Sequence, residues 1–593
     1  MLKTENLVPQ SRLLVLAGFS LLLILILVFR FFQLQVLRYQ QYKVKSEANI
    51  IRAQSIPAPR GLIYDRNGQI LVDNRPTYVL LATPAEMTDP DSILPIIAEH
   101  SGLDLSQLQA AYDKNYRGRF QPIRLAKDLT IYQLSRIAEH RSELPGISYK
   151  QFPERYYPAV VRAAHLIGYI REVDRNFLTT AEIASEYRIG DLIGWRGLEK
   201  MYEASLRGKN GVRYLQVDVM GRAMEGGAER GVIKPLPGND IHTTVDSDLQ
   251  NLIEAEMEGY RGAVVVSLPQ TGEILAQGSF PDYPPDLFSG ATLSEDWTHY
   301  AGRPDNPLLN RVTHGYYPPG STFKPLVAIA LLENEIIDTS QTITCTGSYR
   351  LGRRTFACWN PAGHGKVNLR DAIEQSCNVY FYNMIQLTPL DVWAQVVRDF
   401  GFGSLAQIDL PSEQAGIIPD TDFMEAKYGQ GRWTKGHLLN IAIGQGDVLV
   451  TPIQMLTYVN ILANQGGAVR PHLVEKGSDY PEIDVTVSPD TWSILQRYLL
   501  GVTHGENGTG KLAQPRDTTI VTAGKTGTSE NPHGEPHAWF IGWAQQGDQM
   551  VSVVILMENS GHGGDVAAPL ARKIFQLYFQ KLAEQEHHLA YAD

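Results

Sequence analysis

Ser321 and Lys324, three positions apart, combine residue types that could act as a nucleophile and its base. A serine hydroxyl attacks a carbonyl only when a neighbouring group takes its proton. A lysine can take that proton only if burial or a nearby cation lowers its pKa. The apolar run 326–332 predicts a buried helix, and a helix starting at or just before Ser321 would place both side chains on one face. Alone, the pair is more typical of an ordinary helix terminus with a solvated lysine.

Two further polar motifs follow in the same half of the chain. Ser376 and Asn378 come after the helical run 369–374 and offer a hydroxyl and an amide on a short loop. Lys525 opens a Lys-Thr-Gly-Thr sequence after an apolar strand, and Gly527 within it would let a substrate backbone lie close against that strand. Each motif by itself is usual for a cap or a strand end. Their occurrence together, in this order, favours one shared site.

The three cysteines, Cys345, Cys358 and Cys377, lie in one cluster between these motifs, together with His364. An odd number of cysteines in one cluster is not a disulfide framework. Three thiols and one imidazole could complete a tetrahedral zinc site, although the spacing is not that of a common zinc finger. The residues leave three states open: a zinc site, a Cys345–Cys358 disulfide with Cys377 free, or three reduced core thiols.

The motifs must be positioned by a domain that combines strands and helices. Apolar runs predict strands near both ends of this region, and the chain closes with a helix. The expected strands cover 262–267, 273–277, 537–543 and 551–557, and the expected helix covers 567–582. Strands at both ends with helices between them predict one α+β domain whose sheet is completed by both ends of the domain.

The first half of the chain contains no recognisable catalytic set. Asn67-Gly68 between apolar runs predicts a hairpin. Apolar spacing predicts helices over 89–144, and strands are expected at 165–170 and 212–217. Arg60, Asp65 and Arg66 could form a buried ion-pair network or simply flank the hairpin, and we interpret them as structural.

Composition sets the limits of the interpretation. A chain of 593 residues predicts two to four domains, and 43% hydrophobic with 20% charged residues is typical of globular proteins. The net charge of −11 argues against wholesale binding of nucleic acid. The apolar run 13–29, extended by Phe31 and Phe32, is long enough to span a bilayer. A cleaved signal peptide is disfavoured because no small-residue cleavage site follows the run.

The flanking charges do not decide the orientation of this membrane helix. Positive residues are more numerous after it than before it, and a simple count would leave the large C-terminal region in the cytoplasm. Long domains, however, cross the membrane largely regardless of flanking charge. We expect the bulk of the chain outside the cytoplasm because of the function that follows.

The three motifs together resemble the signature of penicillin-binding proteins and serine β-lactamases. Additional segments resemble the class B penicillin-binding proteins over nearly the whole chain. Those segments are 60–68, 197–199 with Tyr202, 443–446 with Thr451 and Pro452, and, for the elongation-type penicillin-binding protein 2 group, 30–35 and 537–540.

This resemblance implies an α+β fold with four regions. They are a cytoplasmic tail (1–12), a single transmembrane anchor (13–35), an elongated mixed pedestal domain of the dimerisation type (36–238) and a transpeptidase domain (239–593). The transpeptidase domain is expected to hold a central antiparallel five-stranded sheet flanked by helices. The anchor is expected in the inner membrane, with the catalytic domain on the periplasmic side.

The resemblance also implies roles for individual residues. Ser321 would attack the penultimate D-Ala carbonyl of a peptidoglycan stem peptide ending in D-Ala-D-Ala, and Lys324 would act as its base. Ser376 would relay the proton to the leaving amine, tuned by Lys525, and Asn378 would hold Lys324 or the substrate amide. The substrate carboxylate would be bound at Thr526, Gly527 and Thr528, with the backbone N–H groups of Ser321 and Thr528 as the oxyanion hole.

The acyl-enzyme would pass to an amine of a neighbouring stem peptide, with D,D-carboxypeptidase activity as a side reaction, and β-lactams would trap it covalently. Some members of the penicillin-binding protein 2 group bind zinc in the cysteine region, which makes Cys345, Cys358, His364 and Cys377 its candidate ligands here. No cofactor is expected for acyl transfer itself. Expected partners are a membrane glycosyltransferase of the shape, elongation, division and sporulation family and other elongation-complex proteins. No binding of nucleic acid is expected.

Two alternative functions remain. A division-type class B transpeptidase would share the motifs but would generally lack the insertion that holds the cysteines. A non-catalytic or β-lactam-sensing scaffold of the wall-synthesis complex would not require all three motifs to be intact. A bifunctional class A enzyme or a free β-lactamase does not fit the pedestal-like region and the anchor.

Overall fold

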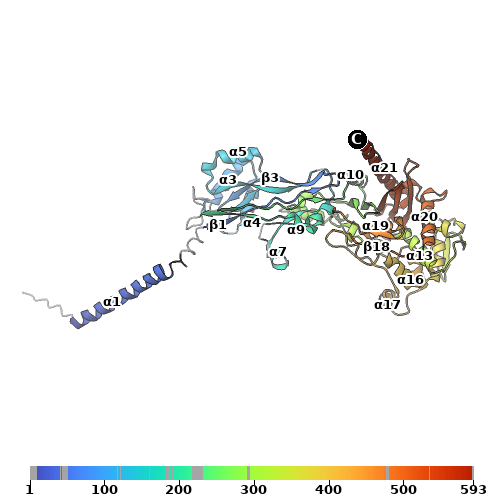
Figure 1. Ribbon diagram of the computed structural model, residues 1–593, viewed down its shortest axis with the longest axis horizontal. Helices are drawn as coiled ribbons and strands as arrows, with labels where there is room; N and C mark the ends of the chain where they lie inside the picture. Colours follow the sequence, from blue (N-terminus) through green and yellow to red (C-terminus); the bar gives the residue numbers. More distant parts are fainter. Residues whose placement is uncertain are drawn as a thin grey trace, which may run out of the picture. The chain divides into compact units, whose positions relative to one another are not determined.

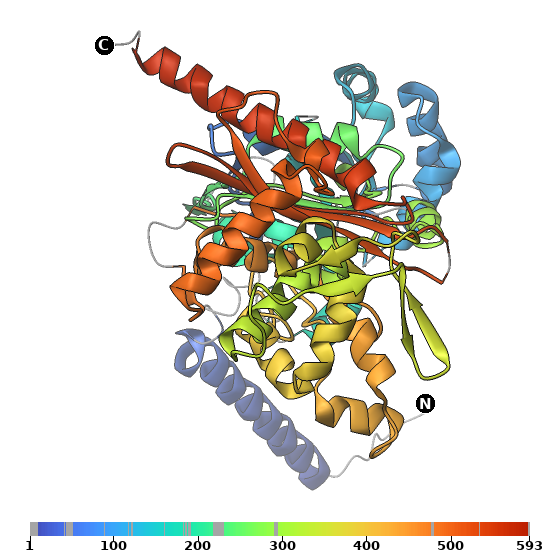
Figure 2. The same cartoon turned by 90° about the vertical axis from the view of Figure 1, so that its right-hand side faces the viewer.

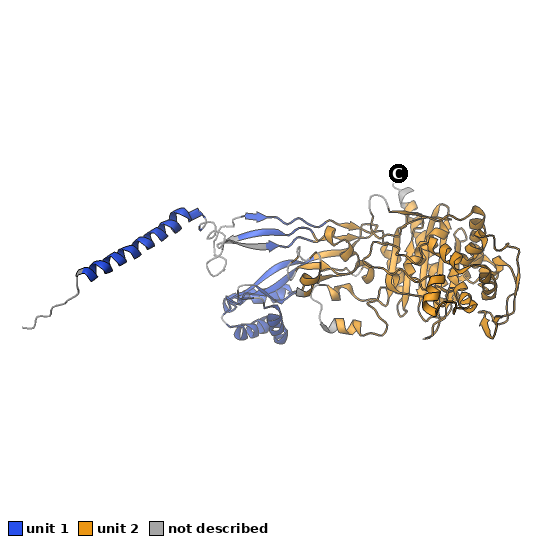
Figure 3. Ribbon diagram, turned by 90° about the horizontal axis from the view of Figure 1, so that it is seen from below, with its two compact units in different colours: residues 1–59, 75–154, 208–238 blue, residues 60–74, 155–207, 239–593 orange. Residues whose placement is uncertain are grey.

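The computed structural model describes residues 10–40, 42, 51–87, 89–116, 118–119, 122–158, 160–181, 183, 187, 191–216, 231–289, 294–475, 480–532 and 534–590. The chain forms two compact units, which Figure 3 colours separately. Unit 1 comprises residues 1–59, 75–154 and 208–238, and unit 2 comprises 60–74, 155–207 and 239–593. Unit 2 therefore includes two segments from the N-terminal half of the sequence.

Unit 2 is built on a five-stranded sheet in the order β12-β11-β21-β20-β19, and every neighbouring pair is antiparallel. This arrangement confirms the expected central antiparallel five-stranded sheet. The strands come from both ends of the domain, as the apolar runs indicated. Their bounds are β11 Gly262–Ser267, β12 Ile274–Phe280, β19 Val521–Ser529, β20 His537–Gln546 and β21 Gln549–Met557.

The two faces of this sheet carry different cores because successive side chains of a strand point to opposite faces. Val264, Phe540 and Ile555 pack against α10 (Ser247–Glu256) and the C-terminal helix α21 (Gly563–Ala590). Their neighbours Val265, Trp539 and Val554 belong to the core formed with the helices of the opposite face. Figure 2 shows these helices and α21 on opposite sides of the sheet. The principal helices of that layer, several of them labelled in Figure 1, are α13 Lys324–Glu333, α14 Leu369–Glu374, α15 Asn378–Met384, α16 Leu390–Asp399, α18 Lys435–Ala442, α19 Pro452–Ala463 and α20 Pro489–His504.

The Asn67-Gly68 hairpin forms as expected, between β2 (Ile63–Tyr64) and β3 (Ile70–Ala82). Asp65 is buried and accepts hydrogen bonds from the Asn67 and Gln69 backbone N–H groups, at 2.8 and 2.7 Å. Gly68 takes a positive φ of 81°, which explains a glycine at this turn.

A buried ion-pair network lies next to this hairpin in unit 2. Glu199, in α8 (Gly197–Met201), is fully buried and accepts from Arg60 Nε and from Arg155 Nε, both at 2.6 Å. Arg60 also contacts Glu203 at 2.7 Å. The structural interpretation of Arg60 is therefore confirmed, and its partners are residues that sequence reasoning did not connect with it.

Besides the N-terminal apolar helix, the described part of unit 1 contains three α-helices and several strands. The helices α3 (Pro90–Ser101), α4 (Leu105–Asn115) and α5 (Ile131–Glu139) share one apolar core. The helical expectation for 89–144 misses β4 (Ile123–Ala126), which pairs with the end of β3. Four residues with alternating burial give too short a signal to separate a strand from helical spacing.

Several short helices and strands lie outside the central sheet. A strand expected at 165–170 is wrong over its first part, where α6 (Ala164–Ile167) forms before β6 (Ile170–Glu172). Further strands include β1 Ile51–Ile56, β5 Ile147–Tyr156, β7 Leu192–Gly194, β8 Gly211–Gln216, β9 Gly231–Ile233 and β10 Ile241–His242. The expected 212–217 strand is confirmed up to residue 216, and residue 217, like 1–9 of the expected tail, lies outside the described residues.

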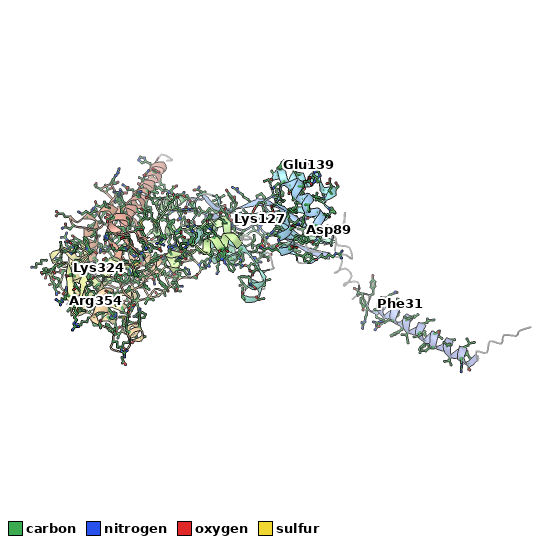
Figure 4. The ribbon with its side chains drawn as sticks, turned by 180° about the vertical axis from the view of Figure 1, so that it is seen from behind. Phe31, Asp89, Lys127, Glu139, Lys324 and Arg354 are labelled. Atoms are coloured by element: carbon green, nitrogen blue, oxygen red, sulfur yellow. The ribbon has the colours of Figure 1, made fainter. Side chains whose placement is uncertain are left out.

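The N-terminal apolar run forms α1 (Gln10–Phe32), continued by a short π-helical turn over Gln33–Leu37. In the described part of the chain, Ser11–Leu37 is the one segment long and apolar enough to cross a membrane. Its side chains, including the labelled Phe31 (Figure 4), are exposed apolar surface, which requires a lipid or protein environment.

Candidate active site

Ser321 lies on a tight turn that leads directly into a buried helix. Residues Gly320–Phe323 form a 3-10 turn, and α13 begins at Lys324. The helix therefore starts just after Ser321, slightly later than the sequence predicts. Lys324 is completely buried, and Pro325 occupies the first turn of the helix, where no backbone donor is needed. Ser321 itself remains partly exposed.

Glycines allow the turn to pack tightly between its neighbours. Gly320 has φ +60°, and a Cβ there would lie 2.7 Å from Ser529 Oγ. The Gly320 N–H donates to the Gly444 carbonyl at 2.9 Å, which gives the 443–446 segment a structural role. A Cβ on Gly527 would lie 2.9 Å from Thr322 Cγ2 and 3.0 Å from Trp539 Cβ. Gly527 is thus required for packing within the protein, whatever it does for substrate.

Lys324 is directed toward the second motif. Its Nζ donates to Asn378 Oδ1 at 2.7 Å, to the Ser376 carbonyl at 2.7 Å and to Ser376 Oγ at 3.1 Å. Burial lowers the pKa of Lys324 to about 8, against a smaller opposing effect of the nearby cysteines. With this pKa about a tenth of the amine is unprotonated at pH ~7, compared with well under a thousandth at the ordinary lysine pKa, and only the unprotonated form can act as a base.

Lys525 approaches the same hydroxyl from the sheet. The Lys-Thr-Gly-Thr motif lies within β19 rather than after it, and β19 is an edge strand. Lys525 pairs with Ile541 across the sheet and points to the face that packs on α13. Its Nζ donates to Ser376 Oγ at 3.0 Å and to the Thr526 carbonyl at 2.9 Å. Burial, and secondly the charge of Lys324, holds its pKa well below the ordinary value.

Ser376 occupies a strained position between two helices. Its φ is +54°, in the left-handed region that non-glycine residues rarely adopt. The turn is held by the hydrogen bond from the Cys377 N–H to the Ala372 carbonyl at 2.9 Å, and α15 begins at Asn378. This conformation directs Ser376 Oγ toward both lysines, so the strain serves the geometry of the site.

The three sequence motifs therefore converge. In the described part of the chain, neither lysine donates a hydrogen bond to Ser321 Oγ. Both bind Ser376 Oγ instead. A hydroxyl has two acceptor lone pairs and one proton, so an oxygen that accepts from two amines keeps its O–H free to donate elsewhere. Catalytic hydrogen bonds often shorten only when substrate is bound, which is consistent with an open position for Ser321.

The threonines of the third motif have partners that sequence reasoning missed. Thr526 Oγ1 and Thr509 Oγ1 form a hydrogen bond at 2.6 Å, and Thr528 Oγ1 lies 3.3 Å from His562 Nδ1. Both partners come from loops outside the motifs. Neither has a local pattern that could have identified it, because the contact depends on the folded sheet.

The cysteine cluster lies beside this site. All three cysteines are buried and unpaired, and Cys345 Sγ and Cys358 Sγ lie 3.5 and 3.6 Å from His364 Nδ1. The four candidate ligand atoms, including Cys377 Sγ, all lie within 4.8 Å of one another. Ligands of tetrahedral zinc at about 2.3 Å (sulfur) and 2.05 Å (nitrogen) would be separated by about 3.6 Å. The residues therefore fit a metal ion.

The pKa values of two of these thiols are shifted in opposite directions. A hydrogen bond between the sulfurs of Cys358 and Cys377 lowers the pKa of Cys358 and raises that of Cys377. His364 Nδ1 faces Cys345 and Cys358, while its buried Nε2 has no hydrogen-bond partner among the described residues. A cluster that favours a thiolate next to an imidazole nitrogen offers the donor set of a structural zinc site.

Comparison with known proteins agrees with this geometry. Residues 262–576 match the family model of the penicillin-binding protein transpeptidase domain, and residues 55–243 match that of the penicillin-binding protein dimerisation domain. The peptidoglycan D,D-transpeptidase MrdA of Haemophilus influenzae is 31% identical over 98% of this chain and 94% of its own length.

Solved structures give the same assignment. The penicillin-binding protein 2 of Helicobacter pylori, in a complex with MreC, is 28% identical over 89% of this chain and 100% of its own, with a TM-score of 0.79. A chain from a peptidoglycan synthase complex that coordinates polymerization and crosslinking is 29% identical over 96% of this chain and 98% of its own, with a TM-score of 0.70. From its motifs, its folded site and these relatives, the chain belongs to the class B penicillin-binding proteins.

Proposed function

We propose that this protein is a peptidoglycan D,D-transpeptidase that cross-links stem peptides during cell elongation through an acyl-enzyme on Ser321. The observation that carries the proposal is the convergence of Lys324 and Lys525, both fully buried, on Ser376 Oγ beside the Ser321 turn. Among the described residues neither amine has a carboxylate partner, which makes their burial costly, and a proton-transfer site explains why both are retained.

The reaction follows from these contacts. Lys324 Nζ takes the Ser321 proton as Oγ attacks the penultimate D-Ala carbonyl of the donor peptide. The resulting oxyanion is bound by the backbone N–H groups of Ser321 and Thr528; loss of one such donor costs about 3 kcal/mol in other enzymes. As the C–N bond breaks, Ser376 donates its proton to the departing D-Ala amine and recovers one from Lys324. Asn378 keeps the Lys324 amine in place throughout.

The acyl group is then transferred to an amine of a second stem peptide. That amine attacks the ester and gives its proton through Ser376 to Lys324; as the ester C–O bond breaks, Lys324 returns a proton to Ser321 Oγ. Water in place of the amine gives the D,D-carboxypeptidase side reaction. The open edge of β19 suits the donor peptide, which can pair with the strand while Thr526 and Thr528 bind its terminal carboxylate.

Covalent labelling with a fluorescent penicillin tests this proposal directly. We expect wild-type protein to form an adduct that is absent in Ser321→Ala, with both proteins unfolding at the same temperature. An adduct that persists in Ser321→Ala would refute the assignment of the nucleophile. A folded wild-type protein that forms no adduct would favour a non-catalytic scaffold.

The membrane arrangement is the second part of the proposal. Residues 13–35 anchor the protein as a single inner-membrane span, 36–238 form the pedestal, and 239–593 form the transpeptidase domain on the periplasmic side. The apolar surface of α1 supports the anchor. The proposed reaction supports the orientation, because peptidoglycan stem peptides lie outside the cytoplasm. Alkaline phosphatase fused after residue 593 should be active in cells, and an inactive, stably expressed fusion would contradict the orientation.

We further propose that Cys345, Cys358, His364 and Cys377 hold a structural zinc ion. The ion would supply no chemistry to acyl transfer; it would fix the loop that carries Ser376. Metal analysis should find zinc in wild-type protein at one equivalent or more, with a loss of one equivalent in Cys358→Ser. Zinc well below one equivalent in untreated wild type would refute the site. Acylation that is unchanged after the metal is removed would refute its effect on Ser376.

The partners of the relatives suggest those of this chain. We propose that it works with a membrane glycosyltransferase of the shape, elongation, division and sporulation family and with an MreC-type protein. The similarity to a synthase complex and to a complex with MreC supports both. Co-purification of the tagged chain from its own membranes should recover both partners, and recovery of division proteins instead would favour the division-type alternative.

A further inference from the structure

A second cluster of side chains of the types that ligate metals lies in unit 1, far along the sequence from the catalytic motifs. His100 is in the last turn of α3, His140 caps the C-terminus of α5, and Glu143 ends the short 3-10 turn Arg141–Glu143. The two imidazole rings are stacked, with centroids 3.6 Å apart and planes 6° apart. No part of the transpeptidase mechanism uses these residues.

The carboxylate of Glu143 reaches both rings. Its Oε1 lies 3.2 Å from His140 Nδ1, and its Oε2 lies 3.8 Å from His100 Nε2. One ligand atom from each of the three residues lies within 4.8 Å of the others. Nitrogen and oxygen ligands about 2.0–2.2 Å from a tetrahedral zinc ion are separated by about 3.4 Å, which falls between the two observed distances.

We propose that His100, His140 and Glu143 form a binding site for a divalent transition-metal ion of the zinc type. Two imidazoles and one carboxylate are a donor set that suits such ions. The His100 and His140 side chains are only 15% and 29% exposed, whereas Glu143 is 55% exposed, so a fourth ligand would be water from the solvent side. Binding requires the rings to tilt apart, because each nitrogen lone pair lies in its ring plane.

The site would join α3 to α5 at the edge of their common core. The helices already pack through Ile97 and Ile137, both of which are buried. The metal would add a link between the C-terminal ends of the two helices, where backbone carbonyls are unsatisfied and a cation is favoured. A bound ion would therefore stabilise unit 1 rather than take part in a reaction.

This site differs chemically from the cysteine cluster, and an experiment can distinguish the two. The full-length protein in detergent is equilibrated with zinc, and bound zinc is measured for wild type and Glu143→Gln. We expect Glu143→Gln to hold one equivalent less, in the wild-type background and equally in Cys358→Ser. Glu139→Gln is the matched control, because it removes an exposed carboxylate at the end of α5 (labelled in Figure 4) that is not one of the three proposed ligands.

Cobalt provides a second readout that does not depend on stoichiometry. Co²⁺ at a nitrogen and oxygen site gives weak visible bands without the intense thiolate charge-transfer absorption of a cysteine site. We expect His140→Ala and Glu143→Gln to lose only the weak component. Equal zinc content in wild type and Glu143→Gln, or a cobalt spectrum that Glu143→Gln leaves unchanged, would overturn the proposal. A variant that loses zinc but also unfolds would be replaced by His100→Gln, for which the same loss is expected.

Discussion

Asn378→Asp should move the pH dependence of acylation without removing a single catalytic atom. In the wild type, Asn378 Oδ1 accepts from Lys324 Nζ at 2.7 Å. The substitution places a carboxylate at that position with nearly the same shape. Two opposite unit charges about 4 Å apart interact by about 4 kcal/mol at an effective dielectric constant of about 20. Part of this gain is offset by burial of the new carboxylate.

The new carboxylate should raise the pKa of Lys324. An opposite charge at this range shifts the pKa of its partner by about one to three units. Burial places the pKa of Lys324 at about 8 in the wild type, and a rise of about two units would bring it near 10. At pH about 7.5 the neutral fraction of the amine then falls by about 80-fold. The neutral amine that remains is a stronger base, which offsets part of this effect. The acylation rate should therefore fall by about tenfold or more.

The sign of the pH dependence follows from the role of the amine. A base must be unprotonated, so wild-type acylation should rise with pH and level off above about 8. The Asn378→Asp rate should still be rising at pH about 9.5. The assay is the second-order rate constant for labelling by a fluorescent penicillin, measured across pH on protein whose folding is checked by circular dichroism.

Asn378→Leu is the control for this prediction. It removes the same hydrogen bond but adds no charge, so acylation should slow while the curve levels off at the same pH as in the wild type or lower. If Asn378→Asp also levels off at the wild-type pH, deprotonation of Lys324 does not limit acylation, and its assignment as the base is wrong.

Three further substitutions test separate parts of the structure. Ser376→Ala removes the oxygen that Lys324 and Lys525 share, and acylation should fall by about 10²–10⁴-fold in protein that is still folded; a loss below tenfold would exclude Ser376 from proton transfer. Gly527→Ala places a methyl group 3.0 Å from Trp539 Cβ and should cost about 1–3 kcal/mol, visible as a lower Tm; an unchanged Tm would contradict this packing. Glu199→Gln leaves the buried Arg155 without its charge partner and should cost about 3–5 kcal/mol in chemical denaturation, so a loss below about 1 kcal/mol would show that the network is not needed for stability.

Most strands of the central sheet and the residues of the three motifs could be predicted from the sequence. Four alternating or fully apolar runs predicted four of the five strands of the central sheet, because strands that are buried on both faces leave little room for polar residues. The fifth strand, β19, was expected to end before Lys525 but extends through the motif to Ser529. The three motifs could be grouped because their order resembles that of a known family. The structure then places Lys324, Ser376 and Lys525 in mutual contact, although Lys525 and Ser376 lie 149 positions apart.

Other features depend on long-range contacts that leave no local pattern. Thr509 and His562 look like ordinary loop residues until β19 brings Thr526 and Thr528 to them. Gly527 was expected to give substrate access to the strand, but its environment shows that the Thr322 and Trp539 side chains already occupy the space a side chain would need. The left-handed backbone of Ser376 is likewise invisible in the sequence, since serine is not a residue that signals a positive φ.

The cysteine cluster helps to hold the strained backbone of Ser376 in place. A non-glycine residue with φ +54° costs on the order of 1–3 kcal/mol and persists only when its surroundings hold it. Cys377, the next residue, is completely buried, and its sulfur is hydrogen-bonded to Cys358, which belongs to a different hairpin segment. This contact fixes one end of the loop, while Lys324 fixes the other through the Ser376 carbonyl and Asn378. Since the same sulfur is one of the candidate metal ligands, the hydroxyl that we propose as the proton relay lies one residue away from the cluster, and metal binding or oxidation of Cys377 should alter the position of Ser376.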